Sequence, residues 1–566
     1  MVLALVIGAG AGLGSIVFRW CITTFTRLFT GHEDYAASPG AGHPHLPWLG
    51  PYFVLLAPVI GGLLYGPLVN RFAKEARGHG VPEVMLAVAQ RGGRISPKVA
   101  VVKTLASALC IGSGGSVGRE GPIVQIGSAL GSTLGRVTKV TEGRMKLLVA
   151  CGAAGGIAAT FNAPLAGVFF AMELILGTFT AEAFGATVLA GVSASVIGRA
   201  AFGDVTFLNL PDFHVDHLAQ YALFALLGVI AAAVGVGFAR VLYLIEDACD
   251  WAWRGPEWLR PAVGGLALGL VLLALPEMYG VGYPVLQKAT EGGYAVGFLL
   301  LLLVGKTIAT SLTIGIGGSG GVFAPSLFIG AMLGAAYGTG LHHLLPGTAG
   351  AVGAYALVGM GAVFAGASRA PITAVVILFE LTGEYGIILP LMLAIVLATA
   401  VSRLLSKDTV YTLKLRRRGI DLEGAVPGAP IGTQQVGAVM EALPSPLPAA
   451  TALADAAALL SRSGHGALPV VDADGHYAGI VTAQAVAEAL AEQPYDAPTL
   501  VGRLAVPPVP VTADQPLAQA LHALLSAPGT GVPVLDSRQG EPVGWLSHQS
   551  VLHAVHDTRW SAKQPV

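Results

Sequence analysis

Charged residues are scarce in this sequence. Only 11% of its 566 residues are Asp, Glu, Lys or Arg, and the formal net charge is −1. That balance excludes a strongly basic protein that binds nucleic acid. Hydrophobic residues make up 54% of the chain, and the mean hydropathy is +0.69. So few charges among so many apolar residues indicate an integral membrane protein that crosses the bilayer several times.

Cysteine is also rare, and the C-x-x-C spacing of many metal sites is absent. The chain has four cysteines, all in or near apolar segments: Cys21, Cys110, Cys151 and Cys249. We therefore expect free thiols, with neither a disulfide framework nor a bound metal. The N-terminus lacks the small-residue cleavage site of a secretory signal. Residues 2–25 are mostly apolar, with Arg19 among them, and we expect them to form the first membrane helix.

Further apolar segments follow along the chain. They lie at roughly residues 51–70, 98–111, 123–137, 147–176, 184–202, 218–244, 260–276, 296–314, 325–345, 351–366, 371–381 and 386–405. Several are shorter than the ~20 helical residues that span a bilayer. Short spans are tolerated where their ends line a cavity inside the protein. Two basic segments, 71–98 and 414–418, are expected on the cytoplasmic side by the positive-inside rule. The expected location is a bacterial plasma membrane.

The stretch GSGGSVGREGP, residues 112–122, places an Arg and a Glu among glycines inside an apolar region. Glycines let backbone N–H groups approach a ligand closely, and the N–H groups at a helix N-terminus form an anion site. A carboxylate beside such a site would compete with the anion, which indicates a gated anion pathway. The alternative is a glycine-rich turn for helix packing that also carries a charge pair.

A similar stretch recurs in the second half of the chain. Residues 315–334 read GIGGSGGVFAPSLFIGAMLG and align with residues 112–131 at a constant offset. Further matches are Lys103-Thr104 with Lys306-Thr307, residues 162–165 with 369–372, and Glu173-Leu174 with Glu380-Leu381. We therefore predict a membrane domain over residues 1–408 with two related halves, roughly 1–202 and 218–405. Paired, interrupted apolar segments predict a site between broken helices near the bilayer midplane.

The composition changes after the basic segment. Residues 409–433 end in a Pro/Gly-rich run and are predicted to be a linker. Two soluble units follow, at residues 434–492 and 498–560, and each has the pattern strand, helix, strand, strand, helix. This order resembles a tandem pair of CBS domains that pack as one module.

Three glycine motifs and one tyrosine occur in order along the chain: Gly78-His79-Gly80-Val81-Pro82, Gly118-Arg119-Glu120-Gly121-Pro122, Gly321-Val322-Phe323-Ala324-Pro325, and Tyr411. They resemble those of the CLC family of chloride channels and chloride/proton exchangers, in which the first motif is usually GSGIP. Found together in this order, they are highly specific, and the resemblance covers essentially the whole chain. It implies a polytopic all-α membrane domain with an inverted repeat of broken and tilted helices, followed by a C-terminal α/β CBS-pair domain in the cytoplasm.

The resemblance also implies roles for these residues. Glu120 would be the gating glutamate, whose carboxylate occupies an anion site in the closed state. The N–H groups of Val322 and Phe323, with the Tyr411 hydroxyl, would hold the central anion, and the other motif residues would line the same site. Helix N-termini supply partial positive charge without a full charge that would trap the ion. The expected partners are the lipid bilayer, chloride, protons, and a second copy of the chain in a homodimer with one pathway per subunit.

Two residues depart from the family pattern. His79 replaces the usual Ser, so it is either a cationic anion ligand or a space-filling side chain. Leu174 stands where exchangers often carry an internal proton-transfer glutamate, and Leu cannot carry a proton. Glu173 beside it is expected to be structural, because Glu380 is its counterpart. These residues favour a chloride transporter that is channel-like or weakly proton-coupled. The alternatives are an obligate chloride/proton antiporter or a transporter of another small anion.

Two other readings concern ligands and catalysis. CBS pairs that bind adenine nucleotides place an Asp three residues after a Ser or Thr. Thr482 and Ser547 are the candidate contacts here, but Ala485 and Ser550 stand at the Asp positions. A structural dimerising module is therefore at least as well supported as a nucleotide sensor, and no cofactor is required. Ser319 lies in a GxSG sequence like that of rhomboid-type membrane proteases, but the same glycines recur in the first half.

Overall fold

The structure is a computed structural model that describes residues 1–203, 217–347, 349–420, 434–492, 499–506, 511–527, 529–536 and 541–561. The chain forms two compact units, Met1–Asp421 and Leu422–Val566. Eight helices among the described residues are long and apolar enough to cross a membrane. The four cysteines are free thiols.

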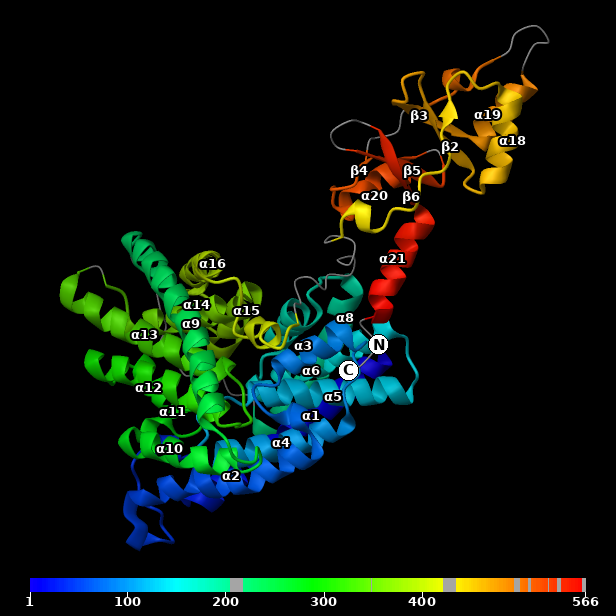
Figure 1. Ribbon diagram of the computed structural model, residues 1–566. Coiled ribbons are helices and arrows are strands. Elements are labelled where there is room, and N and C mark those ends of the chain that lie inside the picture. The colour runs from blue at the N-terminus through cyan, green and yellow to red at the C-terminus, as the bar shows by residue number, and fades with distance from the viewer. Residues whose placement is uncertain are drawn as a thin grey trace. The chain divides into compact units, whose positions relative to one another are not determined.

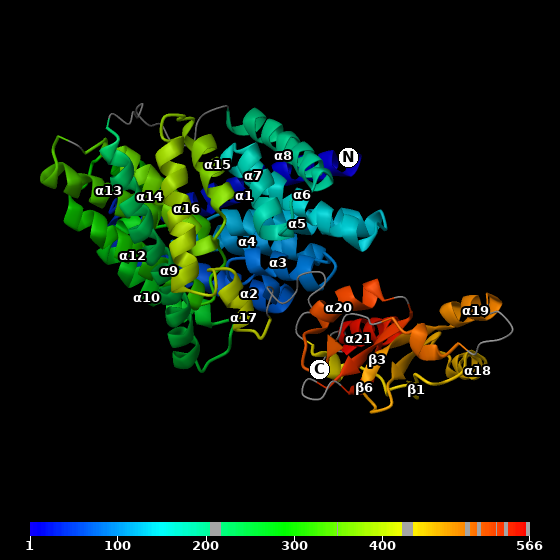
Figure 2. The same cartoon turned by 90° about the horizontal axis from the view of Figure 1, so that it is seen from above.

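The first unit is helical and follows the expected repeat. In chain order, the first half forms α1 (Val2–Thr30), α2 (Phe53–Phe72), α3 (Val81–Gln90), α4 (Pro97–Gly112), α5 (Glu120–Val137), α6 (Glu142–Phe161), α7 (Pro164–Phe170) and α8 (Ala181–Phe202). The second half forms α9 (Ala219–Ala252), α10 (Arg260–Ala274), α11 (Tyr283–Thr290), α12 (Val296–Gly315), α13 (Phe323–Leu344), α14 (Val352–Ser368), α15 (Pro371–Thr382) and α16 (Ile388–Leu405). The two halves lie side by side (Figure 1, Figure 2).

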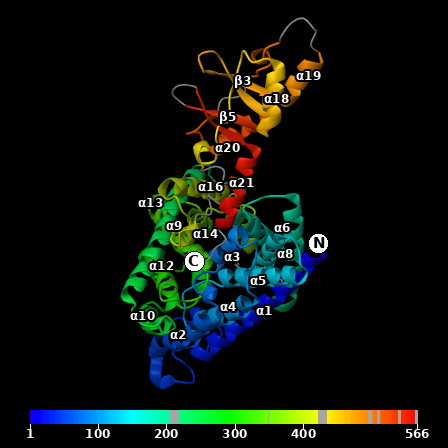
Figure 3. The same ribbon diagram turned by 45° about the vertical axis from the view of Figure 1, so that its right-hand side comes forward.

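Glycines set the spacing of the central helices. Gly127 on α5 faces Gly152 on α6, and a Cβ added to Gly127 would lie 2.1 Å from the Gly152 carbonyl oxygen. Gly330 on α13 faces Gly359 on α14 in the same way, at 2.3 Å. Small residues allow helix backbones to approach closely in membranes. The paired helices α5 and α6 appear next to each other in Figure 3.

The end of the first unit differs from the sequence prediction. Residues 409–420 were assigned to a linker by composition, yet they form α17 (Thr412–Arg416), which packs on α3 within the membrane domain. The reason is burial, because the side chains of Val410, Tyr411 and Leu415 are almost completely covered. The rest of the predicted linker, residues 421–433, lies outside the described residues.

The C-terminal unit contains two small sheets with related order. The first combines β1 (Leu447–Pro448), α18 (Leu453–Ser463), β2 (Ala467–Val471), β3 (Tyr477–Thr482) and α19 (Ala483–Ala491). The second combines β4 (Val511–Thr512), α20 (Leu517–Ser526), β5 (Gly531–Leu535), β6 (Pro542–Ser547) and α21 (His548–Ser561). In each sheet the first strand pairs in parallel with the second, and the second pairs antiparallel with the third. This is the α/β pattern expected of a CBS pair.

Candidate anion-binding site

Three glycine-rich loops meet at the centre of the membrane domain. The N–H of Gly118 donates to the Gly321 carbonyl at 2.8 Å, and the N–H of Gly321 donates back at 2.6 Å. The N–H of Gly78 donates to the Gly318 carbonyl at 3.0 Å, and the Gly320 N–H donates to the Gly78 carbonyl at 3.3 Å. The three predicted motifs, which are far apart in sequence, are therefore held together by backbone hydrogen bonds.

The helices α3, α5 and α13 start immediately after these loops. Pro82, Pro122 and Pro325 lie in their first turns, where a missing N–H costs nothing because it would have no partner within the helix. Gly121 allows the loops to approach, since a Cβ there would lie 2.1 Å from the His79 carbonyl oxygen. Gly80 has φ of 81°, which favours glycine. The partial positive charges of three helix N-termini thus lie close together.

The carboxylate of Glu120 bonds to the start of α13. Its Oε1 accepts from the N–H groups of Phe323 at 2.8 Å and Ala324 at 3.1 Å. The residue is 1% exposed, and Oε2 has no hydrogen-bond partner among the described residues. The carboxylate thus uses the donors that a helix N-terminus offers to an anion. The resemblance implied N–H groups of Val322 and Phe323 for the central anion, and the carboxylate uses the N–H groups of Phe323 and of the residue that follows it.

The side chain of Arg119 contacts a backbone carbonyl and two aromatic rings. Its Nη2 donates to the Thr160 carbonyl at 3.3 Å. Its guanidinium carbon lies 5.5 Å from the ring centre of Phe161 and 5.1 Å from that of Tyr283. These contacts hold the charged guanidinium of Arg119 in a fixed position near the site.

His79 and Tyr411 lie next to each other, although more than 300 residues separate them in the sequence. Their ring centres are 6.4 Å apart, and both side chains are buried. Tyr243 on α9 lies on another side of His79, with its hydroxyl 3.4 Å from Nε2. That hydroxyl donates to the Val410 carbonyl at 2.5 Å. Sequence reasoning missed Tyr243, because it belongs to no motif and only the fold places it here.

Two buried lysines hold the loops that precede the short helices. Lys103 Nζ donates to the carbonyls of Ala76 at 2.9 Å and Gly78 at 2.7 Å. Lys306 Nζ donates to the carbonyls of Gly280 at 2.9 Å and Val281 at 3.0 Å. Each lysine satisfies its charge with backbone oxygens of the loop. The matched Lys-Thr pairs in the sequence therefore mark equivalent structural positions.

This symmetry exposes a motif that sequence analysis missed. The loop held by Lys306 reads Gly280-Val281-Gly282-Tyr283-Pro284 and opens α11, as Gly78-His79-Gly80-Val81-Pro82 opens α3. The shared G-x-G-x-P spacing upstream of each lysine is the signal that could have found it. The ring of Tyr283 faces the guanidinium of Arg119, so the 280–284 loop also contributes to the site at the centre of the membrane domain.

Glu173 and Glu380 form a reciprocal pair of helix caps: Glu380, on α15, caps the start of α7, and Glu173, just after α7, caps the start of α15. Glu380 accepts from the N–H groups of Leu165 at 2.9 Å and Ala166 at 2.7 Å, at the start of α7. Glu173 accepts from the N–H groups of Ile372 at 3.1 Å and Thr373 at 2.8 Å, at the start of α15. These reciprocal bonds give Glu173 a structural role. Leu174 follows it in the π-helical turn η4 (Ala171–Leu176) and packs against the apolar core.

Glu380→Ala should destabilise the membrane domain. It removes both acceptors from the first turn of α7, and loss of such a cap costs about 0.5–2 kcal/mol. The measurement is the thermal unfolding midpoint of purified protein in detergent. Glu384→Ala, just beyond the end of α15, is the matched control and should leave the midpoint unchanged. Equal midpoints for the two variants would contradict a capping role for Glu380.

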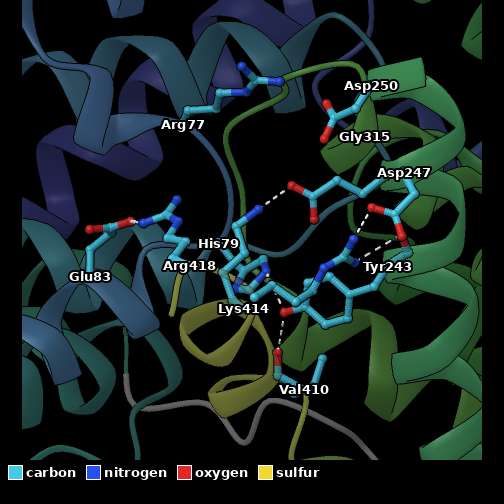
Figure 4. A network of polar contacts seen from close by, with 12 residues as sticks. Arg77, His79, Glu83, Tyr243, Asp247, Asp250, Gly315, Val410, Lys414 and Arg418 are labelled. Atoms are coloured by element: carbon cyan, nitrogen blue, oxygen red, sulfur yellow. Dashed lines mark hydrogen bonds and ion pairs between the residues drawn. The ribbon is translucent and has the colours of Figure 1, made fainter. Parts of the chain in front are cut away.

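A charged cavity of about 340 Å³ opens beside the first loop. Its lining residues are Arg77, Gly78, Glu246, Asp250, Ile314, Lys414, Arg417 and Arg418. The ion pairs in and around it include Lys414 with Glu246, Arg417 with Asp247, Arg418 with Glu83, Arg77 with Glu257 and Arg260 with Asp250. Figure 4 shows the Arg418–Glu83 pair and the contacts of Tyr243 with His79 and Val410. Residues of both basic segments of the sequence therefore line this one cavity, which is called the basic mouth below.

The remaining candidate serines and threonines have bonds within the protein. Ser319 Oγ donates to the Ala76 carbonyl at 2.7 Å. In the C-terminal unit, Thr482 Oγ accepts from the Ala485 N–H at 3.1 Å, as the N-cap of α19. Ser547 Oγ donates to Glu441 Oε1 at 3.0 Å. Each hydroxyl contributes to the fold, and nucleotide binding at Thr482 and Ser547 stays a prediction.

Comparison with protein families identifies both parts of the chain. A family model described as voltage gated chloride channel matches residues 61–403. The CBS domain model matches residues 436–492 and 501–557.

Individual relatives match more than half of the chain. A putative chloride channel protein ClcB-like from Ralstonia nicotianae is 36% identical over 427 residues, which cover 74% of this chain and 97% of that protein. An H(+)/Cl(−) exchange transporter ClcA from Vibrio campbellii is 36% identical over 360 residues, 62% of this chain and 76% of that protein.

Solved structures give the same picture of the fold. A slow cyanobacterial Cl−/H+ antiporter aligns with TM-score 0.65 and 27% identity, over 74% of this chain and 97% of that chain. A eukaryotic CLC transporter aligns with TM-score 0.63 and 23% identity, over 97% of both chains, and at that identity shows the fold alone.

Proposed function

Because the chain belongs to the CLC family of chloride transport proteins, we propose that it exchanges chloride for protons across the membrane. In this proposal Glu120 gates the anion and carries the proton. The observation that carries it is the Glu120 carboxylate on the N–H groups of Phe323 and Ala324. An ionised carboxylate there competes with chloride for the same donors, and protonation removes its charge and weakens that competition. Chloride and proton movement through the site are therefore linked.

The proposal departs from the channel-like reading that Leu174 favoured. Relatives of 33–36% identity include several named as H(+)/Cl(−) exchange transporters, and the cyanobacterial neighbour is titled an antiporter. These names support exchange for this chain over a purely passive channel. A homodimer with one pathway per subunit, with the basic mouth and the CBS pair in the cytoplasm, is part of the same proposal.

Flux measurements on purified protein in liposomes test the proposal directly. An imposed chloride gradient should drive protons uphill, against their own gradient. Chloride flux without proton movement would identify a channel and overturn the exchange. A gradient of an organic acid in place of chloride is the control, and faster movement of that acid would indicate a transporter of larger anions.

The CBS pair should be dispensable for chloride movement. All the site residues described above in the membrane domain come before residue 419, and separate domains can fold alone. A chain that ends at Gly424 should therefore retain chloride flux within a factor of about three of the full-length protein. Flux in liposomes measures this, after gel filtration has shown that the shortened protein is folded. A folded but silent protein would make the CBS pair part of the transport machinery.

A further inference from the structure

Two carboxylates and one histidine each keep one buried polar atom without a hydrogen-bond partner among the described residues. The atoms are Oε2 of Glu246, Nδ1 of His79 and Oε2 of Glu120. Such atoms are rare in folded proteins, and each needs an explanation such as a ligand, a water or a proton. The mechanism proposed above uses Glu120 but gives no task to the other two.

Backbone contacts order these groups from the cavity to the gate. Glu246 and Gly78 line the charged cavity, and His79 follows Gly78 in the chain. A Cβ placed on Gly121 would lie 2.1 Å from the His79 carbonyl oxygen, so the His79 backbone touches the residue next to Glu120. His79 therefore lies between the mouth and the start of α5.

The hydrogen bonds of Tyr243 determine which nitrogen of His79 carries hydrogen. A carbonyl oxygen only accepts, so the Tyr243 hydroxyl gives its single hydrogen to Val410. Its oxygen can then only accept from His79 Nε2, at 3.4 Å. In the neutral ring, Nε2 thus carries the hydrogen and Nδ1 presents a bare lone pair. Nδ1 can take up a proton but, in this state, cannot donate one to an anion.

The charges around His79 link that proton to chloride. The titratable and charged groups that face the ring from the elements packed against it are Tyr243, Tyr411, Lys103, Lys414 and Arg418. Lys414 is paired with Glu246 and Arg418 with Glu83, while Lys103 bonds to backbone carbonyls. The charge of Lys103, which is bonded to neutral carbonyls and not to a carboxylate, opposes an imidazolium when no anion is present. Chloride near Tyr411 offsets the repulsion, so chloride binding and proton uptake should favour each other.

We propose that His79 is the inner proton acceptor of the exchange, in the role that Leu174 cannot fill. The inference rests on the proposed exchange function. A proton from water in the cavity forms an N–H bond at Nδ1 and leaves hydroxide to the solvent. That N–H bond then breaks as an O–H bond forms at the carboxylate of Glu120, which leaves a neutral ring and a neutral acid. No oxidant, reductant or cofactor is consumed.

The test compares His79→Gln with the full-length wild type in liposomes. Gln is similar in size and polar, but it cannot take up a proton. Chloride-driven proton flux should fall by at least about tenfold, within the range for loss of a positioned acid or base, while chloride flux continues. His43→Gln is the matched control, because His43 is a buried histidine in the 31–52 loop region and should not affect coupling. His79→Ser, which restores the usual family residue, is the second variant and should behave like His79→Gln.

A binding measurement gives an independent readout. Chloride affinity by calorimetry should be tighter at about pH 5 than at about pH 7.5 in wild type, because bound chloride favours the imidazolium. This difference should be smaller in His79→Gln, where Glu120 alone links proton and chloride binding. Proton coupling equal to wild type in both His79 variants would overturn the role of His79 and leave the exchange standing. Wild type that moves chloride but no protons would overturn the exchange and this role together.

Discussion

Glu120→Gln should leave chloride moving through the membrane domain and abolish proton movement. Gln keeps the shape of the side chain, and its amide oxygen can still accept from the N–H groups of Phe323 and Ala324. It cannot bind or release a proton, and it lacks the negative charge that competes with chloride. Proton flux should fall below detection, at least about a hundredfold, and the pH dependence of chloride flux should shrink to the part that His79 contributes. Paired chloride and proton recordings in liposomes measure both quantities.

Glu182→Gln is the matched control for this experiment. Glu182 is an exposed carboxylate in the first turn of α8, so it has the same residue type at a helix start outside the site. It should transport like wild type. A pH dependence of chloride flux in Glu120→Gln as large as in wild type would contradict the assignment of Glu120 as the gate, whatever the control shows.

Gly127→Ala should destabilise the membrane domain strongly. The new methyl group would lie 2.1 Å from the Gly152 carbonyl oxygen, and the obstacle is backbone and not a flexible side chain. The two helices would have to separate, and such overpacking costs about 1–3 kcal/mol or more. The helix that moves, α5, carries Glu120 at its first position, so chloride flux should change as well. Thermal unfolding in detergent and flux in liposomes measure the two effects.

Gly143→Ala on α6 is the control, because a Cβ there meets nothing within 4 Å. It should match wild type in both measurements. A Gly127→Ala protein with the wild-type midpoint would mean that α5 and α6 can move apart without cost, which contradicts the packing described above.

The sequence predicted the parts of this protein whose signal is local. Glycine motifs, prolines and the repeated Lys-Thr pairs located the loops and the two halves, because each depends on backbone requirements at fixed spacing. The strand and helix order of the C-terminal unit was also predictable from alternating patterns. The membrane fold and the family, as the comparisons report them, agree with these expectations.

The parts that the sequence did not predict depend on contacts between distant segments. Nothing near Tyr243 in the chain indicates that its hydroxyl faces His79, and the loop at 280–284 was hidden by its lower similarity to the first motif. The predicted start of the linker at residue 409 was wrong, because α17 is too short and too basic to be recognised from the sequence as part of a membrane domain. Leu174 alone could not decide between a channel-like and a proton-coupled transporter, because the other titratable groups near the site could not be located from the sequence.

The reciprocal glutamate caps also set an order of events during synthesis. The N–H groups of Leu165 and Ala166 lack this acceptor until Glu380 is synthesised, 215 residues after Leu165. At about 5 to 20 residues per second, the ribosome needs roughly 10 to 40 s to supply that carboxylate. Throughout this interval the nascent first half holds an uncapped helix start in or near lipid, where unsatisfied N–H groups are costly. If the two halves were made from separate genes, the start of α7 would be capped only when the two chains associate. The rate of capping would then depend on the concentrations of the chains.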